Sequence, residues 1–297
     1  MRKRAWSLPP LRRSTREPSA ELLRVREVAA TPRGEAPAGV AVGTTTVGGV
    51  ECVVCAPASW QGTILYLHGG GYRMGAPAAW TAFTGAVALA TGARVVAADY
   101  RLAPEHPFPA ALHDAVAAYD ALLDDPDAGA IVVGGDSAGG GLAAALVVAC
   151  GTAGVERPSA LFALSPWVDL TITAGTFTSR AETDQFFPEA AAHAAVDVYL
   201  QGHDPRDPLV SPVFADATGF PPTLLFAGGA ETLLDDALAL GTAVARGGAS
   251  VELHAVTGMQ HVWPMLFPDL PESLAAVDAI GRFVRAQVAD GVSARIP

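Results

Sequence analysis

The stretch Gly135-Asp136-Ser137-Ala138-Gly139 decides the fold of this 297-residue chain. It follows the apolar run 130–134 and precedes the helix-favouring run 142–150, which predicts a serine at a sharp turn from a strand into a helix. Such a turn strains the serine backbone, and the flanking glycines let strand and helix approach closely. The pattern therefore predicts that the Ser137 hydroxyl is pushed out of the turn. A purely structural glycine turn is the alternative.

A second glycine-rich stretch, His68-Gly69-Gly70-Gly71-Tyr72, follows the strand-like run 63–67. Successive glycines leave backbone N–H groups uncovered by side chains, and such groups stabilise an oxyanion. The N–H groups of Gly70, Gly71 and Ala138 are the predicted donors. A flexible hairpin loop is the alternative; it is disfavoured because both glycine-rich stretches follow predicted parallel strands.

An activated serine needs an imidazole base, and the chain has seven histidines. His261 lies in a loop after the strand-like run 250–256 and before a last helix, which fits the chain order serine, acid, histidine. We therefore predict His261 as the base. The other histidines considered lie within a strand, in a proline-flanked helical segment or in the predicted cap: His254, His106, His113, His193 and His203.

The acid that orients the imidazole is predicted between the buried strand-like run 223–227 and the helix after it. Glu231, Asp235 and Asp236 are the candidates. Catalytic residues of open α/β sheets lie in loops just beyond the strand ends, which favours Glu231. Asp235 and Asp236 lie at least a turn into the helix, where carboxylates also favour a helix N-terminus. They stay open as alternatives.

Together these motifs resemble the bacterial hormone-sensitive lipase family, whose members are α/β-hydrolase carboxylesterases. The stretches that carry the resemblance are 68–72, 99–111, 135–140 and 211–222, within a similarity from about Val50 to Ala286. The resemblance implies a triad of Ser137, Glu231 and His261 that hydrolyses short- to medium-chain acyl esters without a cofactor or metal. One departure concerns the acid, because many members have Asp-Pro-Leu where this chain has Glu231-Thr232-Leu233.

The alternation of strand-like and helical runs predicts an α/β fold, an eight-stranded mostly parallel sheet with helices on both faces. The longest gap, 165–222, is interpreted as a helical cap insertion, joined by an N-terminal cap segment, 1–35. Residues 36–164 and 223–297 are the predicted catalytic domain. The cap is expected to shape a pocket above the serine. Its expected substrate-binding walls are Tyr72, Trp80, Trp167 and Trp263.

Composition narrows the function classes. Residues 1–33 hold nine Lys or Arg against three Glu, whereas the whole chain has a net charge of −11. The leader lacks a signal-peptide core, no run has the ~20 apolar residues of a membrane span, and nothing suggests nucleic-acid binding. Only three cysteines are present, which fits a reducing compartment. We therefore expect a cytoplasmic protein. Cys52 and Cys55 are not expected to bind metal, because residues three apart in a strand point to opposite faces.

Several other functions are compatible with the same residues. A lactone hydrolase or an amidase uses the same triad, and fold does not decide between them. A non-catalytic ligand-binding protein, similar to the plant gibberellin receptors, is disfavoured because a complete triad is present. A nucleotide-binding protein is disfavoured because Ser137 replaces a glycine that the dinucleotide fingerprint needs. The expected partner is a small-molecule ester or lactone, and a homodimer is left open.

Overall fold

A computed structural model describes residues 4–293, with side chains described as far as residue 289, and confirms the predicted α/β fold. The predicted N-terminal cap segment, 1–35, and the predicted catalytic domain, which ends at 297, therefore each include terminal positions, 1–3 and 294–297, that lie outside the described residues. The strands are β1 (Val40–Val47), β2 (Val50–Pro57), β3 (Thr63–Leu67), β4 (Arg94–Ala98), β5 (Ile131–Asp136), β6 (Ala160–Leu164), β7 (Thr223–Gly228) and β8 (Val251–Val256).

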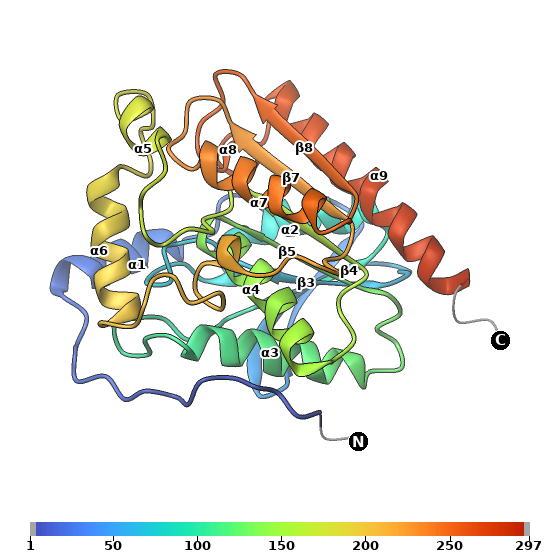
Figure 1. The fold of residues 1–297 in the computed structure, drawn as a ribbon. Coiled ribbons are helices and arrows are strands. Elements are labelled where there is room, and N and C mark those ends of the chain that lie inside the picture. Colours follow the sequence, from blue (N-terminus) through green and yellow to red (C-terminus); the bar gives the residue numbers. More distant parts are fainter. Residues whose placement is uncertain (1–3, 294–297) are drawn as a thin grey trace.

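The eight strands form one sheet in the order β1-β2-β4-β3-β5-β6-β7-β8 (Figure 1). β1 pairs antiparallel with β2, and β2 pairs antiparallel with β4, while every other pairing is parallel. The order places β5 between β3 and β6, near the middle of the sheet. The loops after β3, β5 and β7 therefore open at the same edge, which is where ligands bind in open α/β sheets.

Helices cover both faces of the sheet. The longer helices are α1 (Ala20–Ala29), α2 (Thr81–Thr91), α3 (Ala110–Leu123), α4 (Ser137–Ala153), α6 (Glu189–Leu200), α7 (Leu234–Arg246) and α9 (Pro271–Ser293). The short ones are η1 (Pro77–Trp80), α5 (Thr176–Ser179), η2 (Pro212–Phe214) and α8 (Trp263–Leu266).

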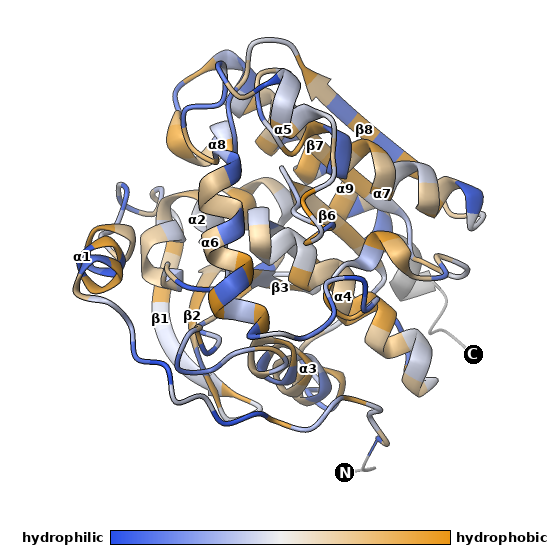
Figure 2. Ribbon diagram, turned by 60° about the vertical axis from the view of Figure 1, so that its left-hand side comes forward, coloured by the Kyte–Doolittle hydropathy of each residue, from blue (hydrophilic) through white to orange (hydrophobic). Residues whose placement is uncertain are grey.

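The core is divided in two by the sheet. Leu65 and Leu67 of β3 belong to the cluster that includes α3, α4 and α7, whereas Ile64 and Tyr66 belong to the cluster that includes α2 and α9. This alternation is the period-two pattern of a strand buried on both faces. Cys52 and Cys55 likewise lie in opposite clusters, and both are free thiols. Figure 2 shows the hydrophobic colour along the central strands and the helices against them.

The segment between β6 and β7 carries α5 and α6 away from the sheet, on the same side of the molecule as α1 (Figure 1). The extended leader before α1 runs from α3 to α6. Arg4 pairs with Asp120 and Asp124 on and after α3, and Arg16 pairs with Asp197 on α6. Arg4 and Arg16 of the leader thus pair with carboxylates of the acidic body, whereas Arg12 donates to the backbone carbonyl oxygens of Leu200 and Gln201.

Candidate active site

Ser137 lies at the junction of β5 and α4, which is the predicted turn from strand to helix. Its φ is 51°, in the left-handed region that residues with a side chain rarely adopt. A Cβ on Gly139 would come closer than 3.0 Å to the carbonyl oxygens of Leu67 and His68, and one on Gly135 would meet Leu67 in the same way. The flanking glycines are therefore required by the close approach of β3 to this turn.

Ser137, His261 and Glu231 form a continuous chain of hydrogen bonds. The Nε2 atom of His261 lies 3.0 Å from the Ser137 Oγ, and its Nδ1 lies 3.0 Å from Oε2 of Glu231. Glu231 is fully buried, and its Oε1 accepts the backbone N–H of Gly228 at 2.9 Å. Because Nδ1–H donates to the carboxylate, Nε2 is left to accept the serine proton.

The other two carboxylates considered for the acid face elsewhere. Asp235 accepts the backbone N–H of Thr176 at 3.0 Å, which joins the start of α7 to α5. Asp236 accepts the N–H groups of Val168 and Asp169, both at 2.9 Å. Neither is hydrogen-bonded to His261. Of the three candidates, the structure brings only Glu231 to the imidazole.

The charge around His261 favours the imidazolium. Burial lowers the pKa of the ring, but the hydrogen bond and charge of Glu231, with the charges of Asp184 and Asp136, outweigh it. The pKa of His261 is therefore raised above its ordinary value of 6.5. A base with a pKa near the working pH both accepts and returns a proton readily.

The glycine loop, residues 68–71, lies beside Ser137. Gly70 and Gly71 have φ values of 122° and 60°, and within residues 4–293 neither donates its N–H in a hydrogen bond. Ala138 lies in the first turn of α4, where backbone N–H groups have no acceptor four residues earlier. Gly70 and Gly71 line the same cavity as Ser137, and Ala138 lies at the positive end of the α4 dipole.

Asp136 fastens the glycine loop to the serine turn, a role that the sequence analysis missed. Its Oδ1 accepts the N–H of Gly69 at 2.9 Å and the hydroxyl of Tyr66 at 2.8 Å. Burial raises the pKa of Asp136 to about 7, although the two donors and the nearby His261 act in the opposite direction. The signal for this residue was its place inside the decisive pentapeptide, next to the serine.

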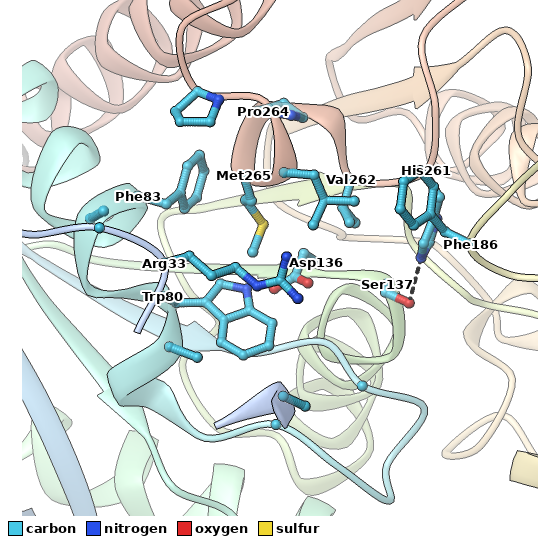
Figure 3. A pocket seen from close by; sticks show the side chains of 18 of the residues that line it. Arg33, Trp80, Phe83, Asp136, Ser137, Phe186, His261, Val262, Pro264 and Met265 are labelled. Carbon is cyan, nitrogen blue, oxygen red and sulfur yellow. Dashed lines mark hydrogen bonds between the residues drawn. The ribbon is translucent and has the colours of Figure 1, made fainter. Parts of the chain in front are cut away.

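A cavity of about 780 Å³ opens in front of Ser137 and His261 (Figure 3). Ser137 and His261 lie at one end of the view in Figure 3, Trp80 and Phe83 at the other, and Met265 between them. This volume falls within the roughly 300–1,000 Å³ of small-ligand sites. Its wall is mostly apolar, with Arg33 and Asp136 among the charged residues.

Of the four aromatic residues expected to line the pocket, Trp80 does so and three do not. Tyr72 is stacked on Tyr199 with ring centroids 3.9 Å apart, and Trp167 packs against Phe187. Trp263 is fully buried against Phe226, in the core cluster that includes α9. Their apolar rings fill the core, so these three expectations were wrong. The wall is completed instead by Phe83, Phe186, Phe187 and Met265.

No site for a metal ion is built into the described part of the chain. Among the residues with described side chains, no three His, Cys, Asp or Glu groups are arranged to hold a metal ion. In the same described residues, every helix is too short or too polar to cross a bilayer.

Comparison with known proteins defines the class to which this fold and site belong. The family described as α/β hydrolase fold matches residues 64–265, and the chain belongs to it. An acetyl-hydrolase of Streptomyces hygroscopicus is 41% identical over 249 residues, which cover 83% of each chain. An esterase of Acinetobacter venetianus is 34% identical over 230 residues, covering 77% of this chain and 76% of the other.

Solved structures agree with these relatives. An esterase described as a member of the bacterial hormone-sensitive lipase family superposes with a TM-score of 0.82 at 39% identity, over 92% of this chain and 100% of that one. The esterase EstE5, in crystals soaked with p-nitrophenyl butyrate, gives a TM-score of 0.82 at 36% identity over the same shares. The expected family and the expected enzyme class, a carboxylic ester hydrolase, are thereby confirmed.

Proposed function

We propose that this chain is a serine carboxylesterase that hydrolyses short- to medium-chain acyl esters through an acyl-enzyme on Ser137. The observation that carries the proposal is the unbroken hydrogen-bonded chain from Ser137 through His261 to Glu231, with its serine end open to the cavity. Esterase and acetyl-hydrolase activities named for the relatives support the same reaction class.

The reaction follows from these positions. His261 takes the Ser137 proton as Oγ attacks the ester carbonyl, and the carboxylate of Glu231 stabilises the imidazolium that forms. The carbonyl oxygen becomes an oxyanion facing the N–H groups of Gly70, Gly71 and Ala138. The imidazolium then gives its proton to the departing alcohol. Water attacks the acyl-enzyme by the same route in reverse and releases the acid.

We also propose that residues 1–35 and 165–222 form a cap on a catalytic domain of 36–164 and 223–297. Support comes from the cavity wall, to which the N-terminal segment contributes Arg33 and Glu35 and the insertion contributes Phe186, Phe187 and Ala191. A wall closed by such side chains excludes water and limits substrate length. Chains of short to medium length are therefore the proposed acyl groups.

The proposal extends to the alternative substrates, the cellular compartment and the oligomeric state. Lactones and amides are alternative substrates because they present the same carbonyl to Ser137. Action in the cytoplasm is proposed on the three cysteines, which are all buried and free. A homodimer is proposed as the assembly in solution, and light scattering would measure its mass.

The test is hydrolysis of p-nitrophenyl esters from acetyl to palmitoyl by the wild type, Ser137→Ala and Ser165→Ala. Ser165 is the matched control, because it is a buried serine with a left-handed backbone at the end of β6 and its Oγ accepts the Val262 N–H instead of facing the cavity. We expect activity that peaks at short to medium chains and is lost only in Ser137→Ala. Activity that survives in Ser137→Ala contradicts the proposal. A wild type that cleaves none of these esters, but cleaves a lactone or an amide assayed beside them, favours those alternatives.

A further inference from the structure

Asp184 joins the segment between α5 and α6 to the loop that carries Glu231. Its Oδ1 accepts the backbone N–H groups of Phe186 and Phe187 at 2.8 and 2.9 Å, and its Oδ2 accepts that of Thr232 at 2.8 Å. The side chain is buried, with 6% of its surface exposed. One carboxylate thus holds together two chain segments that lie almost 50 residues apart in the sequence.

Both segments held by Asp184 contact residues of the triad. The ring of Phe187 is stacked on the imidazole of His261, with centroids 5.5 Å apart and an interplanar angle of 20°. Thr232 follows Glu231 directly, and its hydroxyl lies 2.8 Å from the carbonyl oxygen of Phe187. Any shift of the Asp184 carboxylate therefore moves the ring that covers the base and the backbone next to the acid.

Asp184 also brings a negative charge to the site. Burial raises the pKa of a carboxylic acid, but the N–H groups of Thr232, Phe186 and Phe187 outweigh it, and the pKa of Asp184 is lowered. The group is therefore ionised at neutral pH. Within the described residues, the acidic groups that act on His261 are Glu231 from the loop after β7, Asp136 from the end of β5 and Asp184 from the insertion.

We propose that Asp184 is a positioning residue of the triad, which holds Phe187 over His261 and the acid loop in place, and whose charge stabilises the imidazolium together with that of Glu231. This inference rests on the proposed function, because it concerns the same triad. Asp184 is not hydrogen-bonded to Ser137 and is not itself among the residues that line the cavity, so it acts through Phe186, Phe187 and Thr232 and through its charge.

The variant that tests the proposal is Asp184→Asn, which keeps the volume and one acceptor oxygen but removes the charge. We expect the midpoint of the His261 titration, followed by NMR, to fall by roughly one pH unit. The acid limb of kcat/KM should move by the same amount, with kcat about tenfold lower and KM changed less than about threefold. The His261 resonance is assigned with His261→Gln, and this titration needs no substrate.

Asp235→Asn is the matched control. Asp235 also accepts a backbone N–H across these segments, from Thr176 at 3.0 Å, but it is not among the groups that act on His261. We expect its His261 titration and its kcat to match the wild type. A thermal melt verifies that Asp184→Asn folds, and Asp184→Glu is measured beside it. That variant keeps the charge, so the titration should stay near the wild-type midpoint while kcat falls.

Three results would overturn the proposal. If the His261 titration does not move in folded Asp184→Asn, the charge of Asp184 does not act on His261 and its role is only structural. If kcat does not change in that variant, Asp184 does not position the triad. If the titration midpoint falls in Asp184→Glu, the shift is not due to the loss of charge. The NMR result is independent of catalysis, so the two proposals fail separately. A wild type that cleaves no ester counts against the proposed function alone.

Discussion

Gly69 donates its backbone N–H to Oδ1 of Asp136 at 2.9 Å, which fastens the glycine loop after β3 to the serine turn after β5. The hydroxyl of Tyr66 donates to the same oxygen at 2.8 Å, from within the core strand that leads to this loop. The backbone groups proposed to receive the oxyanion are therefore held relative to Ser137 by one buried side chain. Preorganised donors of this kind need no rearrangement during the reaction.

Replacement of Asp136 should separate its hydrogen bonds from its charge. Asp136→Asn keeps an acceptor oxygen for Gly69 and Tyr66, and we expect kcat within about fivefold of the wild type. Asp136→Ala leaves both donors unpaired and the loop unfastened, and kcat should fall by about 100-fold. Steady-state kinetics on one p-nitrophenyl ester measure both. An equal fall of kcat in the two variants would mean that the hydrogen bonds accepted by Asp136 do not account for its effect on turnover.

The pH dependence of activity should follow His261. Its pKa is raised above 6.5, and the imidazole must be neutral to accept the Ser137 proton. Activity is therefore lost as the pH falls through this raised value, and the midpoint of the acid limb of kcat/KM should lie above 6.5. A pH series with an ester of constant ionisation measures it. An acid limb centred well below 6.5 would show that the carboxylates do not act on the base as described.

Glu231 and Asp235 should differ sharply in their effect on turnover. Glu231→Gln removes the charge that stabilises the imidazolium and disturbs its tautomer, so we expect kcat to fall by about 100- to 10,000-fold. Asp235→Asn should stay within about twofold of the wild type, because its carboxylate binds Thr176 instead of His261. The reverse ranking would transfer the acid role to Asp235.

Asp236 should make the protein less stable as the pH rises. Burial raises its pKa to about 8, against an ordinary value of 3.8, so the folded chain keeps a proton that the unfolded chain releases. Its contribution to stability is complete below the unfolded value and is lost as the pH rises through the folded one. The melting temperature of the wild type should therefore fall, relative to Asp236→Asn, between pH 3.8 and about 8. A constant difference in calorimetry across this range would contradict the raised pKa.

Arg26 should matter more than the other leader arginines. From α1 it donates to both carboxylate oxygens of Glu105, at 2.6 and 2.8 Å, and to the carbonyl oxygens of Arg73 and Ala103. Arg73 follows the glycine loop, so Arg26→Met should lower stability by about 1–3 kcal/mol and also reduce kcat. Arg16→Met, which breaks an exposed pair with Asp197, is the control and should change neither. Thermal melts and kinetics on both variants decide this.

The fold followed from sequence because its signals are local. The strand and glycine patterns around β3 and β5 predicted both elements and the turn between β5 and α4, although α4 begins at Ser137 itself, ahead of the helix-favouring run 142–150. Helix α6 (Glu189–Leu200) lies within the segment 165–222 that was predicted to be helical. The short helices α5 and α8 were not predicted, because four residues carry too little periodicity to stand out.

The surroundings of the site were harder to predict than its motifs. Tyr72, Trp167 and Trp263 were expected in the pocket, but an aromatic residue next to a motif is equally suited to the core, and sequence does not tell which way its ring points. Asp184 was missed because its partners Phe187 and Thr232 come together only through the tertiary fold. Local pattern predicts which chemistry is present, whereas long-range packing decides what supports it.

The central claim is that Ser137 forms a covalent acyl-enzyme with His261 as its base. The most direct measurement is intact-protein and peptide mass spectrometry after acid quenching of a reaction with p-nitrophenyl butyrate, on the wild type, Ser137→Ala and His261→Ala. The account predicts a butyryl adduct on the peptide that contains Ser137 in the wild type, none in Ser137→Ala, and much slower labelling in His261→Ala. An adduct on another residue, or ester turnover by Ser137→Ala at the wild-type rate, would contradict it.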